Sequence, residues 1–240
     1  MSSVDNKHFL KEVLFRIEFE KIDELSDVCE FDQIIKKIVC QEFPKHFLVD
    51  ENYTEFELKE DITLENKGIN KIRIFQKDNI KKFQLNSFSI ILQYNGKFFE
   101  KTKFFKDINL IIEVLKILSV DKIKLTNLRF INEVAPDIEI NDWDNWINSD
   151  LHNFKFEPKN SYLIRSLTRS EYKIEDFNLI FQYGQFNLNY PSHVIRDDFI
   201  LDYDCFLSDE IFIHELEDTF NKMKHIILEF YNESKKDMLK

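Results

Sequence analysis

LTNLRFINEV, residues Leu125–Val134, predicts a β-strand near the middle of the 240-residue chain. Successive side chains of a strand point to opposite faces, so this run places an arginine and an asparagine among apolar residues. One face carries Leu128, Phe130 and Asn132, and the other carries Arg129, Ile131 and Glu133. Such a strand belongs inside a sheet, and we expect the rest of the chain to be arranged around it.

Helical periodicity appears on both sides of this strand. Phe104–Leu118 is apolar nearly all round, which predicts a central helix that is covered on most sides. Phe31–Phe43 has apolar residues at helical spacing and is stopped by Pro44. A short helix is predicted over Asn141–Asp150, and a long one is expected to begin at Ser208–Glu210.

Alternating or apolar runs predict the remaining strands. They are Glu12–Glu20, Tyr53–Leu58, Lys71–Gln76, Lys82–Tyr94, Tyr162–Ile174, Asp176–Asn187 and Asp198–Leu207. Asn95-Gly96 suits a tight hairpin turn, so Phe98–Thr102 is expected to pair back on Ser89–Tyr94. Tyr190–Asp197 is expected to be a loop.

Long helices that follow antiparallel strands predict an α+β fold. We expect mostly antiparallel sheets packed against a central helix and a long C-terminal helix. Residues 1–240 are expected to form a single domain. Its halves, 1–135 and 136–240, each place strands before an amphipathic helix, which suggests two similar halves that arose by internal duplication.

The composition indicates a cytoplasmic protein that binds neither membrane nor nucleic acid. Hydrophobic residues make up 43% of the chain, enough for a substantial core. The formal net charge of −11 disfavours direct binding to nucleic acid or to an anionic membrane, and it suits a protein partner. The cysteines Cys29, Cys40 and Cys205 contain no C-x-x-C motif and fit a reducing compartment.

Four polar residues stand out in otherwise apolar strands: Arg129, Asn132, Asp202 and Asp204. A buried arginine requires a carboxylate, and a buried amide requires hydrogen-bond partners. We therefore predict an ion pair between Arg129 and either Asp202 or Asp204 that joins two strands. The alternative is a ligand site in which Arg129 binds a carboxylate or a phosphate.

Asp202 and Asp204 are also candidate metal ligands. They lie two residues apart on one strand, so their side chains point to the same face. Together with a third ligand they could hold Mg²⁺. The sequence around them offers no companion motif of the type H-x-E, H-x-H or E-x-x-H. We therefore expect no metal and no other cofactor.

Taken together, several stretches resemble a sporadically distributed family of uncharacterised prokaryotic proteins. They are Glu12–Phe19 (EVLFRIEF), Phe88–Leu115, Leu128–Glu133 (LRFINE), and Leu201–Asp204 (LDYD) before the helix of Ser208–Tyr231. The family's typical strand is L-R-Y-I-N-R, so Phe130 and Glu133 depart from it. The resemblance implies an accessory gene of a mobile or defence-type locus and a shared polar core of Arg129, Asn132, Asp202 and Asp204.

These observations favour a non-enzymatic regulator or adaptor that binds a protein partner, of an accessory, defence or toxin–antitoxin type. One alternative is a metal-dependent hydrolase or phosphoesterase that uses Asp202 and Asp204. A second alternative is a small-ligand binder with a phenylalanine-lined cavity, since 25 residues are Phe.

Overall fold

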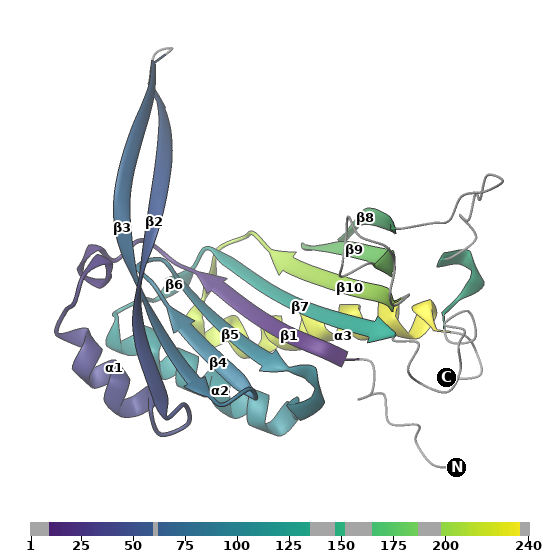
Figure 1. Cartoon of the computed structure of the whole chain (residues 1–240), viewed down its shortest axis with the longest axis horizontal. Helices are drawn as coiled ribbons and strands as arrows, with labels where there is room; N and C mark the ends of the chain where they lie inside the picture. Colours follow the sequence, from purple (N-terminus) through teal and green to yellow (C-terminus); the bar gives the residue numbers. More distant parts are fainter. Residues whose placement is uncertain (1–9, 60–61, 135–146, 152–164, 187–197, 236–240) are drawn as a thin grey trace. The chain divides into compact units, whose positions relative to one another are not determined.

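The computed structural model describes residues 10–59, 62–134, 147–151, 165–186 and 198–235, with side chains described outside 53–68. It confirms the α+β class: a nine-stranded antiparallel sheet is combined with three α-helices in the part of the chain described (Figure 1). The hydrogen-bonded order of the strands is β2-β3-β4-β5-β1-β7-β10-β9-β8.

The strands are β1 (Leu10–Glu18), β2 (Lys45–Lys59), β3 (Ile62–Lys77), β4 (Lys81–Leu85), β5 (Ser89–Asn95), β7 (Leu125–Val134), β8 (Ser166–Ile174), β9 (Phe177–Phe186) and β10 (Asp198–Leu207). The helices are α1 (Phe31–Val39), α2 (Lys101–Ile117) and α3 (Leu216–Ser234). A separate two-stranded sheet pairs β6 (Lys122–Ile123) with β11 (Ile211–Phe212).

The chain divides into two compact units. Unit 1 comprises Met1–Leu14, Asn127–Ser208 and Asp218–Lys240, and unit 2 comprises Phe15–Thr126 and Asp209–Glu217. The units are interleaved in sequence, so their boundaries differ from a division after residue 135. A duplication of the two halves stays a prediction.

In unit 2, α1 and α2 cover one face of the strands. Phe104 of α2 packs against Phe15 of β1 and Tyr94 of β5, with ring centroids 6.1 and 5.3 Å apart. Phe83 of β4 contacts Phe43, which follows α1, at 5.9 Å. Side chains at alternate positions point away from these helices, and we call that side the open face of unit 2.

In unit 1, α3 packs against one face of β9 and β10. Tyr203 of β10 stacks on Phe181 of β9 at 4.8 Å and meets Tyr231 of α3 edge-on at 6.2 Å. Phe220, Met223 and Ile227 of α3 are buried at helical spacing, and this burial anchors the helix.

The strand predicted over Leu125–Val134 is confirmed as β7. Its buried and half-buried positions alternate strictly, and Leu128, Phe130 and Asn132 lie on the buried face. Asp198–Leu207 is confirmed as β10. The strands predicted on either side of Glu175 form a hairpin, since β8 and β9 pair from Ile174↔Phe177 onward and Glu175 adopts a positive φ of 51°.

The prediction of one strand over Lys82–Tyr94 is wrong. The segment forms two strands, β4 and β5, joined by a turn at Asn86–Phe88. The side chain of Asn86 stabilises this turn because its Oδ1 accepts hydrogen bonds from the backbone N–H groups of Phe88 and Ser89.

The hairpin predicted at Asn95-Gly96 is also wrong. Asn95 instead caps a 3₁₀ turn over Gly96–Phe98 by accepting a hydrogen bond from the backbone N–H of Lys97, and α2 begins at Lys101. Phe98–Thr102 therefore leads into a helix and does not pair with β5. Asparagine side chains cap helical turns as readily as they form hairpin turns.

Two helix ends also differ from the predictions. α1 ends at Val39, four residues before Phe43. α3 begins at Leu216, because Ile211–Phe212 pairs with β6 and Ile213–Glu215 forms a 3₁₀ turn. Of the predicted short helix, residues 141–146 lie outside the described residues, as does the predicted loop over Tyr190–Asp197.

We find no helix among the described residues that is long and apolar enough to span a lipid bilayer.

Candidate functional site

Three of the four polar residues singled out from the sequence lie together on unit 1. Arg129 projects from β7, and Asp202 and Asp204 project from β10, on the face opposite α3. Asn127 lies two residues before Arg129 and joins them. The fourth residue, Asn132, is buried on the other face of β7 and does not belong to this cluster.

Of the two ion pairs that the sequence left open for Arg129, with Asp202 or with Asp204, the structure contains the pair with Asp202. Arg129 Nε lies 2.8 Å from Asp202 Oδ1, and its terminal nitrogen lies 2.5 Å from Oδ2. This two-point geometry matches the planar guanidinium to the planar carboxylate, and the hydrogen bonds raise the pKa of Arg129. The arginine is less buried than expected: its side chain is 39% exposed, whereas that of Asp202 is 10% exposed.

Asp204 pairs with Asn127 rather than with arginine. The side-chain amide of Asn127 donates hydrogen bonds to Asp204 Oδ1 and to the backbone carbonyl of Cys205, the latter at 3.4 Å. Burial raises the pKa of Asp204, and the Asn127 hydrogen bond only partly offsets this effect. The two aspartates of β10 are thus held by two different residues of the adjacent strand β7.

This geometry favours a structural role for the cluster. Both carboxylate oxygens of Asp202 bind Arg129, and one oxygen of Asp204 binds Asn127. Among the described residues, no group of three or more His, Cys, Asp or Glu side chains is placed to hold a metal ion. The cluster joins β7 to β10 with charged and amide groups that satisfy one another.

Sequence reasoning missed a buried charged cluster in unit 2. Lys81 Nζ of β4 lies 2.8 and 2.7 Å from the two carboxylate oxygens of Asp107 in α2, and the Tyr94 hydroxyl donates to the same carboxylate. All three side chains are buried. Burial raises the pKa of Asp107 despite these hydrogen bonds. Asp107 lies three residues after Phe104 and four before Ile111, so helical spacing places it on the apolar face of α2.

A second buried cluster centres on Arg73 of β3. Its guanidinium donates to the backbone carbonyls of Leu25 and Asp27 at 2.7 and 2.6 Å and pairs with the carboxylate of Asp32. Arg73 therefore fastens the segment before α1 to the sheet. Ile72 and Ile74 consequently point to the open face of unit 2.

Apolar side chains gather on that open face. The register places Phe47 of β2 opposite Ile74 of β3, Ile74 opposite Gln84 of β4, and Gln84 opposite Ile91 of β5. Val49 lies opposite Ile72 in the neighbouring row. The open-face patch consists of Phe47, Val49, Ile72, Ile74, Phe88 and Ile91.

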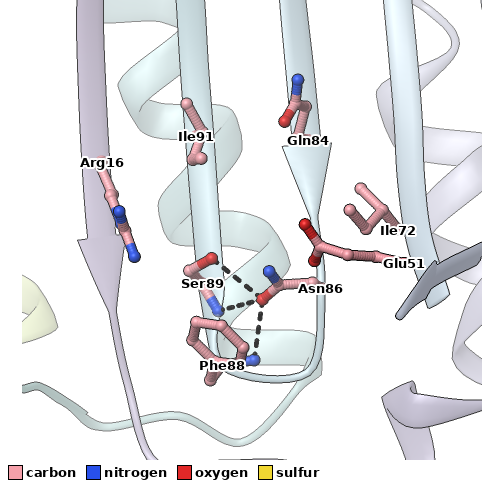
Figure 2. Close-up of a pocket in the computed structure, with 8 residues that line it drawn as sticks. All are labelled: Arg16, Glu51, Ile72, Gln84, Asn86, Phe88, Ser89 and Ile91. Carbon is pink, nitrogen blue, oxygen red and sulfur yellow. Dashed lines mark hydrogen bonds between the residues drawn. The ribbon is translucent and has the colours of Figure 1, made fainter. Parts of the chain in front are cut away.

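A small pocket lies within this patch. Figure 2 shows its eight lining residues: Arg16, Glu51, Ile72, Gln84, Asn86, Phe88, Ser89 and Ile91. Its volume is about 190 Å³. Apolar groups of Ile72, Phe88 and Ile91 lie beside the charged groups of Arg16 and Glu51, so the pocket offers both apolar contact and polar anchoring.

A scan against protein-family models gives no matching family, and a search of curated proteins gives no match. The family resemblance drawn from the sequence stays a prediction.

Proposed function

We propose that this chain is a non-enzymatic regulator or adaptor and that a protein partner binds the open-face patch of unit 2. The observation that carries the proposal is the exposure of large apolar side chains beside one another on the sheet. Phe47 is 50% exposed, Val49 42% and Phe88 37%. Large apolar groups that cluster on a surface mark protein-interaction sites, whereas scattered ones need no explanation.

The pocket supports a protein partner over a free small molecule. Ligand pockets usually have volumes of about 300–1,000 Å³, and this one has about 190 Å³. A pocket of this size suits a single side chain that projects from a larger surface. Interfaces commonly gain most of their binding energy from a few such anchors in pockets.

The polar groups that line the pocket indicate which type of partner side chain would fit it. Asn86 Oδ1 is already engaged by the Phe88 and Ser89 backbone and by Ser89 Oγ, at 2.7–3.0 Å. Its amide group and that of Gln84 remain on the pocket wall, with the Glu51 carboxylate nearby (Figure 2). The Arg16 guanidinium also lines the pocket, and one of its terminal nitrogens pairs with Glu18 at 2.5 Å. An apolar side chain with a polar end, such as tyrosine or methionine, would match this lining.

The two alternative functions receive less support from the geometry. A hydrolase would require Asp202 and Asp204 to turn toward a metal, and both carboxylates are engaged with Arg129 and Asn127. A phenylalanine-lined ligand site would require several aromatic side chains, and Phe88 is the one aromatic residue among the eight that line the pocket described above.

Affinity capture from the source cells tests the proposal. The full chain is tagged, and the captured proteins are compared for the natural sequence and for Phe88→Asp, which places a charge in the open-face patch. We expect a stoichiometric partner with the natural sequence and at least about a tenfold loss with the variant.

Leu228→Asp is the matched control, because Leu228 is also an exposed apolar residue but lies on α3 of unit 1. The control should retain the partner. Equal capture by Phe88→Asp would contradict the proposal, provided that thermal unfolding shows both variants to be folded.

A further inference from the structure

The outer edge of β2 combines exposure with an unusual sequence. β2 is the first strand in the sheet order and pairs with β3, so within the described residues its other edge has no strand beside it. Exposed edges of this kind can pair with another chain, and proteins usually protect them with charge, proline or a covering segment. Here Phe47, Leu48 and Val49 are each at least 41% exposed, so both faces of the edge are apolar.

Charged residues flank these three apolar residues in a complementary order. Residues 45–51 are KHFLVDE, with basic side chains before the apolar centre and acidic side chains after it. Antiparallel pairing of this segment with itself, with Leu48 opposite Leu48, places Phe47 opposite Val49 and Lys45 opposite Glu51. The same register places His46 opposite Asp50, so every charged position meets an opposite or ionisable partner.

We propose that two copies of this chain form a symmetric dimer by antiparallel pairing of their β2 edges around Leu48. The two-fold axis passes beside Leu48, and each pairing on one side of it is repeated on the other, as a closed symmetric interface requires. Residues that lie opposite each other share a face, so Phe47 and Val49 of the two copies form one apolar strip on the open face. Pro44 ends the pairing because it has no backbone N–H.

Existing contacts of the charged residues are compatible with this pairing. Lys45 Nζ lies 2.9 Å from Asp78, and Asp50 lies 2.5 Å from Lys71 Nζ, in ion pairs whose Lys45 and Asp50 side chains are more than half exposed. Exposed pairs of this kind are weak and can be shared or exchanged. The ring of His46 packs on Phe75 of the neighbouring strand β3 at 4.6 Å, so its side chain lies over the inner side of β2.

Sedimentation of the purified full chain over about 1 μM to about 1 mM tests the dimer. We expect a species of twice the 29.1 kDa chain mass. Leu48→Lys should raise the dissociation constant by about 100-fold or more, because two like charges then lie opposite each other at the axis. Leu48 is exposed, so the variant is expected to fold, and far-ultraviolet circular dichroism verifies this.

Charge reversal tests the register. Lys45→Glu and Glu51→Lys, each alone, should weaken the dimer about tenfold, because each variant places like charges opposite one another twice. An equimolar mixture of the two variants should form mixed dimers, since both contacts are then attractive. The double variant should restore self-association. Arg169→Glu, on the strand at the other end of the sheet order, is the matched control and should leave the dimer intact.

A monomer at every concentration would overturn this inference, as would a dimer that Leu48→Lys leaves unchanged. If the chain is monomeric and binds a strand of a different protein at Leu48, the β2 edge is a binding site for that protein and the dimer is likewise overturned. The test uses purified protein and does not involve Phe88, so its failure is distinguishable from failure of the proposed partner site.

Discussion

At the scale of single residues, Arg129 and Asp202 show how partial burial limits the strength of an ion pair. Arg129→Ala would leave the largely buried Asp202 without its partner, which would cost about 3–5 kcal/mol in a fully buried site. Because Arg129 is 39% exposed, water can reach the carboxylate in the variant. We expect a loss of about 1–3 kcal/mol in the free energy of unfolding, measured in urea.

A double-mutant cycle with Asp202→Ala separates the pair from other effects of each substitution. A coupling energy near zero would contradict the pairing as a source of stability.

Substitution of Asp107 should cost more stability than substitution of Arg129, because Asp107 and its partners Lys81 and Tyr94 are all buried. Asp107→Ala would remove the nearer carboxylate of the buried Lys81 ammonium and leave it only Glu42, whose Oε2 lies 3.6 Å from Nζ. We expect a loss of about 3–5 kcal/mol in the free energy of unfolding, larger than that of Arg129→Ala. Lys106→Ala, which removes a surface pair with Glu42, should cost at most about 1 kcal/mol. Similar losses for both variants would contradict the view that burial makes the difference.

Asp204 should make the free energy of unfolding depend on pH, with a sign that follows from its raised pKa. Because burial raises its pKa, the folded protein holds this proton more readily than the unfolded chain does. The contribution of Asp204 to the free energy of unfolding therefore falls as the pH rises above the usual carboxyl pKa. Asp204→Asn removes this fall, so the variant should gain stability relative to the natural protein between about pH 4 and pH 7.

Chemical unfolding at several pH values measures this difference, with the exposed Asp209→Asn as the control for the loss of one charge. A difference that shrinks as the pH rises would contradict the assignment.

The sequence predicts Asp202 or Asp204 as the partner of Arg129, because all three residues interrupt apolar strands. It does not predict Arg73 or Asp107 as buried charges. Arg73 alternates with Ile72 and Ile74, a pattern equally consistent with an exposed arginine. Its burial depends on the carbonyls of Leu25 and Asp27, which a distant segment brings to it.

At the scale of elements, Gly184 fixes how β8 pairs with β9. Gly184 lies opposite Leu167 and has a φ of +140°, and a Cβ there would lie 2.0 Å from the backbone oxygen of Ser166. Gly184→Ala must therefore displace the β8 backbone. We expect a loss of about 2–4 kcal/mol in the free energy of unfolding. Relative to the natural protein, amide hydrogen exchange should accelerate more in β8 than in β4. Unchanged exchange in β8 would contradict this role.

Elements with strong periodicity are predicted well, and the elements that meet at the turns of Asn86 and Asn95 are not. β7 and β10 match their predicted bounds, with buried and half-buried residues alternating strictly along β7 and less regularly along β10. β4 and β5 were expected as one strand because the residues around Asn86 continue the apolar pattern. The turn there depends on one asparagine side chain, as does the 3₁₀ turn at Asn95, and asparagine serves either kind of turn.

At the scale of the whole molecule, the α+β class follows from the order of strands and helices, and the structure confirms it. The division into interleaved units does not follow from sequence order, because unit 2 also includes Asp209–Glu217. That segment contains β11, which pairs with β6 about 90 residues earlier in the chain. The open-face patch likewise depends on the register of four strands, which no single stretch of sequence specifies.

Photo-crosslinking in the source cells tests the partner site most directly. Benzoylphenylalanine replaces Phe88 in the open-face patch or, as a control, Tyr172, an aromatic residue of β8 with similar exposure. We predict a covalent adduct with one partner protein from position 88 and no such adduct from position 172. No adduct from position 88, or the same adducts from both positions, would contradict partner binding at the open face.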